Sequence, residues 1–299
     1  MTVRPSVVSA VLVLAVLGVS LSGPLVRLSD AHPLAVAVWR LAFSLAIIAV
    51  PLAVGGSWRQ WRTLDRSSLG LAMAAGAMLA LHFWSWNTSV GLTTIAASVV
   101  LVNTQPLIVA GLSAAWLRER PTRTQWLGIG VAMLGALIVA LPDLMSAGSL
   151  SFRGRAVLGD GLALVGAVTA AIYYVIGRRL RASLDLWAYV GLVYGACLLA
   201  LIMLALAIDA PLWPQPRREL GIFALLALGP MLLGHTGMNW ALRHVRAYQV
   251  NIVLLGEPVG ATLLAAALPG IRETPPALTL VGGVVVLAGI LLAERQREG

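Results

Sequence analysis

The chain has 299 residues, of which 59% are hydrophobic and 11% are charged, and its formal net charge is +9. This composition excludes an ordinary soluble globular domain, in which about a quarter of the residues are charged. The positive charge comes from 21 arginines, which are spread along the chain. Because they do not gather into a basic patch, nucleic-acid binding is a poor interpretation.

Apolar runs recur along the whole chain, and each is close to the roughly 20 residues that an α-helix needs to cross a bilayer. Ten such runs are present, at 6–26, 34–54, 67–90, 95–117, 124–142, 156–177, 185–208, 220–242, 247–269 and 276–293. Short connections separate them, so little of the chain is left for a soluble domain. We therefore predict an all-α integral membrane protein with ten transmembrane helices.

One pattern of five residues occurs twice. Its members are His82, Pro106, Glu119, Gly128 and Gly135 in the first half, and His235, Pro258, Glu273, Gly282 and Gly289 in the second. Partners are separated by 152 to 154 residues, and so constant a spacing indicates an internal duplication. We divide the chain into a first repeat at 1–142, a linker at 143–155 and a second repeat at 156–299.

The number of spans in each repeat decides how the repeats are oriented. Five crossings return the chain to the opposite side, so the second repeat must have inverted topology, as in many secondary transporters. If the helices stand upright, His82 and His235 lie at mirrored depths, roughly 15 Å apart along the membrane normal.

The arginines predict the orientation of the bundle. Fourteen of them lie in the two terminal tails or in the connections after the second, fourth, sixth and eighth spans, and six lie on the opposite side. The positive-inside rule then places both termini in the cytoplasm. We expect a multi-pass protein of the inner or plasma membrane.

Specific motifs resemble the EamA branch of the drug/metabolite transporter superfamily. They are the Leu117-Arg118-Glu119-Arg120 corner, the following Gln125-Trp126-Leu127-Gly128, and the closing helix GGVVVLAGI at 282–290. The resemblance implies a ten-helix inner-membrane exporter of small metabolites, with helices 1, 3, 4, 6, 8 and 9 lining the pathway. The second repeat departs from the family pattern, because Gly270-Ile271-Arg272-Glu273 stands where the family tends to have Leu-Gly-Glu.

Two histidines are the main candidates for a functional site, because ionisable groups inside a membrane usually face the bundle interior. His82 shares a helical face with Trp86, and His235 shares one with Asn239. These four side chains would line a substrate cavity, in which a histidine could exchange a proton near neutral pH. The alternative is a hydrogen bond between helices, with the imidazole neutral throughout.

Two prolines mark a second group of candidates. Asn103 precedes Pro106, and Asn251 and Glu257 precede Pro258. Glu257 is a candidate proton carrier, whereas its structural alternative is a neutral acid bonded to a carbonyl that Pro258 frees. The two amides would either contact substrate or repair the kinked backbone.

Tyr173 and Arg40 complete the candidates. Tyr173 falls in the sixth span, which the family resemblance places on the pathway. Arg40 lies about two turns into the second span, a helix that flanks the pathway in related carriers. For Arg40 we favour a structural role or a side chain that extends toward the outer interface, rather than one that faces a substrate carboxylate.

Together these features predict a secondary transporter that exports amino acids, nucleosides or drug-like compounds by alternating access. The bilayer and a small molecule are the expected partners, and no cofactor or metal is expected. Both proton antiport and facilitated diffusion remain open, and nothing indicates an oligomeric state. The alternatives are a membrane-embedded enzyme with His82, His235 and Glu257 as acid/base groups, and a flippase or scaffold subunit for lipid-linked substrates. Motifs of ATPases and hydrolases are missing from the sequence.

Overall fold

The computed structural model describes residues 3–93, 95–146, 153–267 and 276–294. These ranges contain helices and connections but no strand, which suits an apolar chain whose backbone groups must hydrogen-bond to one another within lipid. Glu273 and residues 147–152 of the linker predicted at 143–155 fall outside the described residues.

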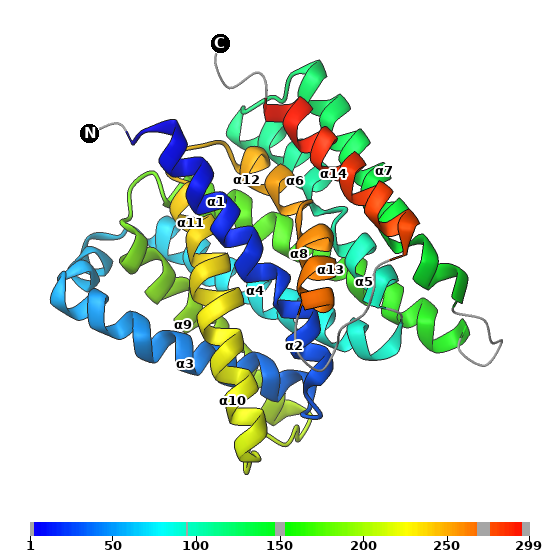
Figure 1. Ribbon diagram of the computed structural model, residues 1–299. Coiled ribbons are helices and arrows are strands. Elements are labelled where there is room, and N and C mark those ends of the chain that lie inside the picture. Colours follow the sequence, from blue (N-terminus) through cyan, green and yellow to red (C-terminus); the bar gives the residue numbers. More distant parts are fainter. Residues whose placement is uncertain (1–2, 94, 147–152, 268–275, 295–299) are drawn as a thin grey trace.

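The described helices form one bundle (Figure 1). In the first half they are α1 (Pro5–Ser20), α2 (Ser22–Leu28), α3 (Pro33–Val54), the short 3-10 helix η1 (Ser57–Thr63), α4 (Arg66–Leu92), α5 (Ile95–Val102), α6 (Gln105–Leu112), the π-helical turn η2 (Ser113–Leu117) and α7 (Arg123–Ser146). In the second half they are α8 (Arg153–Leu180), α9 (Leu186–Ala207), α10 (Arg217–Leu226), the π-helical segment η4 (Ala227–Thr236), α11 (Gly237–Ala241), α12 (Ala247–Leu254), α13 (Glu257–Ala267) and α14 (Ala277–Glu294).

Seven helical segments among the described residues are long and apolar enough to cross a membrane. They are Pro5–Leu28, Pro33–Val54, Arg66–Leu92, Ala97–Leu117, Gly154–Leu180, Leu186–Ala207 and Arg217–Ala241. Two shorter apolar helices cover Arg123–Val139 and Ala277–Ala293. The chain is therefore a multi-pass membrane protein, and the full count of ten spans stays a prediction.

Two of the predicted spans are broken near their centres. Asn103 and Thr104 separate α5 from α6, and Leu255 and Gly256 separate α12 from α13. In the first break, the amide of Asn103 donates to the Val99 carbonyl at 2.8 Å and the Thr104 hydroxyl donates to the Leu101 carbonyl at 2.7 Å. The same two carbonyls also accept the backbone N–H groups of Asn103 and Thr104, at 3.0 and 3.1 Å, so the side chains add hydrogen bonds at the break.

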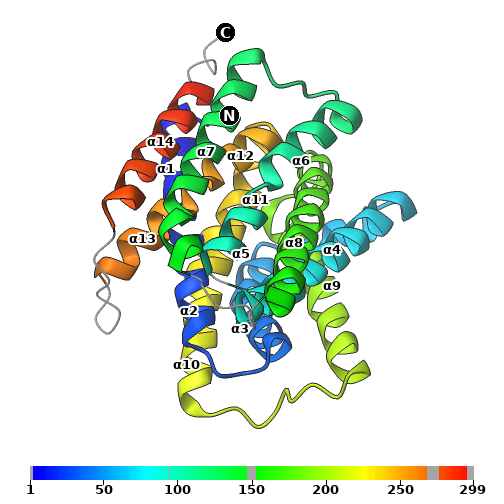
Figure 2. The same ribbon diagram turned by 90° about the vertical axis from the view of Figure 1, so that its right-hand side faces the viewer.

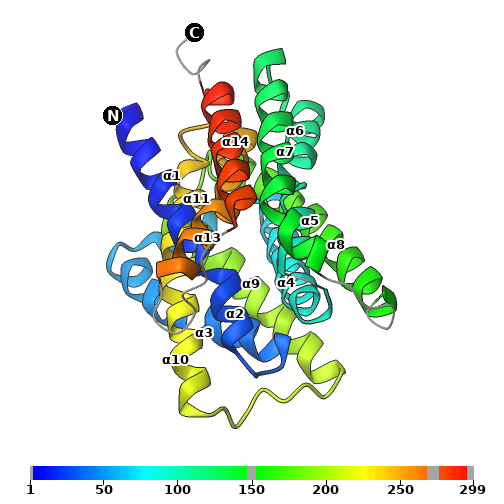
Figure 3. The ribbon, with the colours of Figure 1, turned by 45° about the vertical axis from the view of Figure 1, so that its right-hand side comes forward.

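The packing places both breaks inside the bundle. α6 contacts α12, so the two broken segments meet, and α4 packs along both α8 and α9. On the other side, α1 packs against η4 and α11. The start of α1 and the end of α14 lie at one end of the bundle, and the connection from α9 to α10 lies at the opposite end (Figures 2 and 3). The single cysteine, Cys197 in α9, is fully buried in this core.

Glycines hold α7 and α14 together along one side of the bundle. A Cβ atom built on Gly135 would lie 2.4 Å from the Val286 nitrogen, and one on Gly289 would lie 2.4 Å from the Ala132 nitrogen. Gly128 and Gly282 are equally crowded by the facing backbone. The glycines of the repeated pattern therefore let the two backbones approach closely.

Replacing Gly135 with alanine should separate α7 from α14. The added methyl group has no space, so we expect a loss of about 1–3 kcal/mol of stability, typical of overpacking, seen as a lower Tm in detergent. Gly130→Ala on the same helix is the control, because nothing lies within 4 Å of its added Cβ. Equal Tm values for the two variants would contradict this account of the helix contact.

Candidate functional site

A cavity lies where the broken helices meet α4 and α8. Its polar and aromatic lining consists of Ser22, Arg40, His82, Phe83, Trp86, Asn103, Gln105, Tyr173, Tyr174, His235 and Glu257. The cavity is narrow, with a volume of about 50 Å³.

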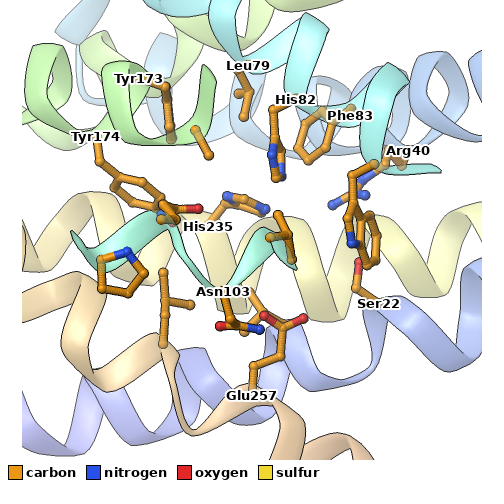
Figure 4. Close-up of a pocket in the computed structure, with 17 residues that line it drawn as sticks. Ser22, Arg40, Leu79, His82, Phe83, Asn103, Tyr173, Tyr174, His235 and Glu257 are labelled. Atoms are coloured by element: carbon orange, nitrogen blue, oxygen red, sulfur yellow. The ribbon is translucent and has the colours of Figure 1, made fainter. Parts of the chain in front are cut away.

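The two histidines meet in this cavity (Figure 4). Their ring centroids are 6.3 Å apart, in an edge-on arrangement. Nδ1 of His82 lies 2.9 Å from the Gly166 carbonyl of α8, whereas Nδ1 of His235 is buried with no hydrogen-bond partner. His82 thus makes the predicted contact between helices and also lines the cavity.

The predicted separation of the histidines, roughly 15 Å along the normal, is wrong. That value assumed upright helices of uniform rise. Instead, the α4 helix is inclined to the segment that runs from α10 to α11 (Figure 1), and His235 lies in the π-helical turns of η4, which contain Pro230. π-Helical turns change the rise and the facing of residues, and they often occur at functional sites.

Arg40 also faces the cavity. Of the two interpretations favoured from the sequence, the side chain that extends toward the outer interface is therefore wrong, and the structural role stays untested. Its side chain on α3 is 0% exposed, and its guanidinium carbon lies 4.1 Å from the centre of the Phe83 ring. Nη2 lies 3.7 Å from the sulfur of Met231 in η4. The side chain of Arg40 lies between α3, α4 and η4. These helices therefore prevent it from reaching the interface.

The wall formed by the broken helices supplies the remaining polar groups. Asn103 and Glu257 lie across the cavity from His82 and Arg40 (Figure 4). Asn103 stands in the first break and Glu257 begins α13 directly after the second. Pro106 lines the cavity as well, whereas Pro258 is not among the lining residues.

Two of the predicted substrate ligands stand behind the lining. Asn239 is 0% exposed, and its amide donates to the hydroxyl of Tyr173 at 2.5 Å and to that of Tyr194 at 3.2 Å. Asn251 accepts a hydrogen bond from Gln105 and donates to the Ala247 carbonyl at 2.9 Å. These asparagines position lining residues and do not themselves reach the cavity.

Some lining residues were not among the sequence candidates. Phe83 follows His82 directly and Tyr174 follows Tyr173, so each adjacent pair presents two aromatic groups to one cavity. Gln105 neighbours Pro106, but its role emerges only from the contact between α6 and α12. Ser22 looked like part of an ordinary apolar span. Hydropathy alone could not identify these residues, since it averages over all faces of a helix.

A polar cluster closes the bundle at the end where the termini lie. The guanidinium of Arg178 donates to Glu119 at 2.8 Å and to the Leu242 carbonyl at 2.6 Å. Glu119 also accepts a hydrogen bond from the Ala247 nitrogen at 3.3 Å. This network links the corner after η2 to α8 and α12, and so joins the two halves of the chain.

Arg181, at the same end, is buried at 1% exposure and donates to the Asn239 carbonyl at 3.0 Å. Burial lowers the pKa of its guanidinium to about 10, which still leaves it charged near neutral pH. This backbone contact connects the closed end of the bundle directly to the asparagine behind Tyr173.

A second polar cluster closes the opposite end. Arg218 donates to Asp30 and Glu219, each at 2.9 Å, and the Ser29 hydroxyl donates to Glu219 at 2.5 Å. The cluster ties the connection after α2 to the start of α10, again across the two halves. Charged contacts therefore hold the chain together at both ends of the cavity.

The fold is that of a multi-pass membrane protein in which apolar helices enclose a cavity with polar lining residues. Two segments, residues 7–141 and 157–294, match the model of the EamA-like transporter family. The chain belongs to this family, and it is a transporter rather than an enzyme.

The chain is also similar to proteins named as exporters and to a solved structure. It is 29% identical to the "Pseudopaline exporter CntI" of Pseudomonas aeruginosa, with 79% of this chain and 78% of that protein covered. It is 27% identical to the "Probable terminal-alkyne amino-acid exporter" of Streptantibioticus cattleyicolor, with 86% and 81% covered. A crystal structure matches with a TM-score of 0.78 at 18% identity over 97% of both chains, a likeness of fold.

His82, His235 and Glu257, the acid/base groups of the enzyme alternative, line a single cavity. The assignment as a transporter therefore depends on the family and its relatives, not on the positions of these three groups. Within the described part of the chain, no group of three or more His, Cys, Asp or Glu side chains could hold a metal ion.

Replacing Asn239 with leucine should destabilise the protein by about 1–3 kcal/mol, because it removes the donor from two buried tyrosine hydroxyls. Thermal unfolding in detergent measures the loss. Tyr173→Phe and the double variant complete a cycle, in which we expect the double variant to lose less than the sum of the single losses. Strictly additive losses would show that Asn239 does not support Tyr173.

Proposed function

We propose that this protein is a secondary transporter that exports small organic metabolites by alternating access. The observation that carries the proposal is the polar cavity at the centre of the bundle, closed at each end by a charged cluster that links the two halves. Alternating access requires a central site and two closures that open in turn. The Arg178–Glu119 and Arg218–Asp30–Glu219 clusters are the candidate closures.

We further propose that the bundle has ten spans in two inverted repeats, 1–142 and 156–299, joined by 143–155. The packing supports this arrangement. In the two repeats, α4 corresponds to the α10 to α11 segment and α8 corresponds to α1. The contact of α4 with α8 therefore has a counterpart in the contact of the α10 to α11 segment with α1, and both contacts are present. The contact of α7 with α14 converts into itself. The Arg tally favours cytoplasmic termini in the inner or plasma membrane.

Within the cavity, we assign substrate contact to His82, Trp86, Asn103, Tyr173 and His235. Asn239 and Asn251 position Tyr173 and Gln105, as their hydrogen bonds indicate. The breaks before Pro106 and Pro258 provide the irregular backbone beside the site. Amino acids, nucleosides and drug-like compounds are the candidate cargoes, and two relatives named as exporters favour outward movement.

Transport by the purified full-length chain tests this proposal. Proteoliposomes loaded with a panel of labelled amino acids and nucleosides should release at least one compound. Trp86→Ala and His82→Ala should each slow that release about tenfold or more, as expected when a contact worth at least about 1.4 kcal/mol is lost. Trp213→Ala is the control, because Trp213 is 69% exposed in a connection. Release that is unchanged in both cavity variants would contradict the site.

Glu257 is our candidate for coupling export to protons. With an inward proton gradient, release by the wild type should accelerate. The Glu257→Gln side chain cannot bind or release a proton, so the release rate of this variant should not depend on the gradient. Asp209→Asn is the control, because Asp209 is exposed in the connection after α9. A gradient response that survives in Glu257→Gln would exclude this carboxyl as the coupling group.

A further inference from the structure

Arg40 is a charged side chain buried in the centre of the bundle. It is 0% exposed and belongs to the lining of the cavity. In Figure 4 its guanidinium lies beside His82 and Phe83, on the side of the cavity away from Glu257. Arginine cannot shed its charge as readily as histidine or lysine can, so a positive charge is fixed at this position.

The guanidinium is almost without hydrogen-bond acceptors. Neither Nε nor Nη1 has a partner, and Nη2 reaches only the weak acceptor sulfur of Met231 at 3.7 Å. The ion pairs found among the described residues involve Arg178 and Arg218 instead. A buried charge that lacks a partner costs several kcal/mol, and the Phe83 ring offsets only part of this cost, about 2 kcal/mol.

A second donor in the cavity is also unsatisfied. The indole nitrogen of Trp86 is buried and has no acceptor, although the ring lines the same cavity as Arg40. Trp86 lies one helical turn after Phe83 on α4, so its ring lies on the same face as the ring that contacts Arg40. Two independent donors therefore lack acceptors in a single cavity, which points to a ligand that brings an anionic oxygen.

We propose that Arg40 binds the carboxylate of the transported metabolite, so that the cargo is a small carboxylic acid of the amino-acid type. The planar guanidinium matches the geometry of a carboxylate. A single arginine balanced by the single acid Glu257 suits a monoanion or a zwitterion better than a dianionic phosphate. Phe83 and Trp86 beside the guanidinium provide an apolar surface for the rest of the molecule. This inference rests on the proposed transport function and names its substrate class.

Binding of matched compounds tests the inference separately from transport. The probes are L-phenylalanine and 3-phenylpropanoate, which carry the carboxylate, and L-phenylalaninamide and phenethylamine, which lack it. In detergent, the carboxylates should raise the Tm of the full-length wild type, and the other two should not. Chloride and sulfate are tested alone, because an inorganic ion could also occupy the site.

Substitutions then assign the effect to Arg40. Arg40→Met should abolish the Tm shift caused by carboxylates, and Arg40→Lys should weaken their apparent affinity about tenfold. Without ligand, Arg40→Met should be at least as stable as the wild type, because it removes an unpaired buried charge. A structural arginine would instead leave the ligand-free variant less stable.

The outcomes separate this inference from the proposed function. Carboxylate-dependent shifts that vanish in Arg40→Met support the inference even if no probe is released from proteoliposomes. Release of amines as readily as of carboxylates would keep the transporter and overturn the role of Arg40. The role of Arg40 would also be overturned if no carboxylate changed the Tm, or if chloride changed the Tm as much as the carboxylates do.

Discussion

Within lipid, every backbone N–H and C=O group must find its partner inside the protein. This constraint accounts for the long helices of the bundle and for where they are interrupted. The breaks at 103–104 and 255–256 lie where α6 meets α12, so neither is exposed to lipid as a free edge. The side chains of Asn103 and Thr104 add hydrogen bonds to backbone carbonyls at the first break. Irregular backbone is tolerated at this junction because it lies inside the protein. The cavity lies beside the junction.

The sequence predicted those features that depend on local periodicity. Apolar runs located helices such as α3 and α9 to within one or two residues at each end. Five of the seven candidate ligands also line one cavity. The sequence could not give the crossing angles of helices or the π-helical turns of η4, which bring His82 and His235 together. It also misjudged Arg40, because the direction of a long side chain depends on which neighbouring helices close around it.

Asn239 and Asn251 show why polar residues within a span do not all contact a ligand. Both are fully buried, and both hydrogen-bond to residues that do line the cavity. Arg181 extends this chain of contacts from Asn239 to the closed end of the bundle. A rearrangement of that end would therefore change the position of Tyr173. These hydrogen bonds provide a physical connection between the closed end of the bundle and the cavity.

The burial of Cys197 has a practical consequence for studying the orientation of the chain. It is the only cysteine, and its thiol lies in the core, 0% exposed. A maleimide that cannot cross membranes has no native target on the folded protein, so the natural chain already serves as a background for single-cysteine labelling. Cysteines placed in turn in the connection after α9 and near Arg59 would report directly which end of the bundle faces the outside of a cell.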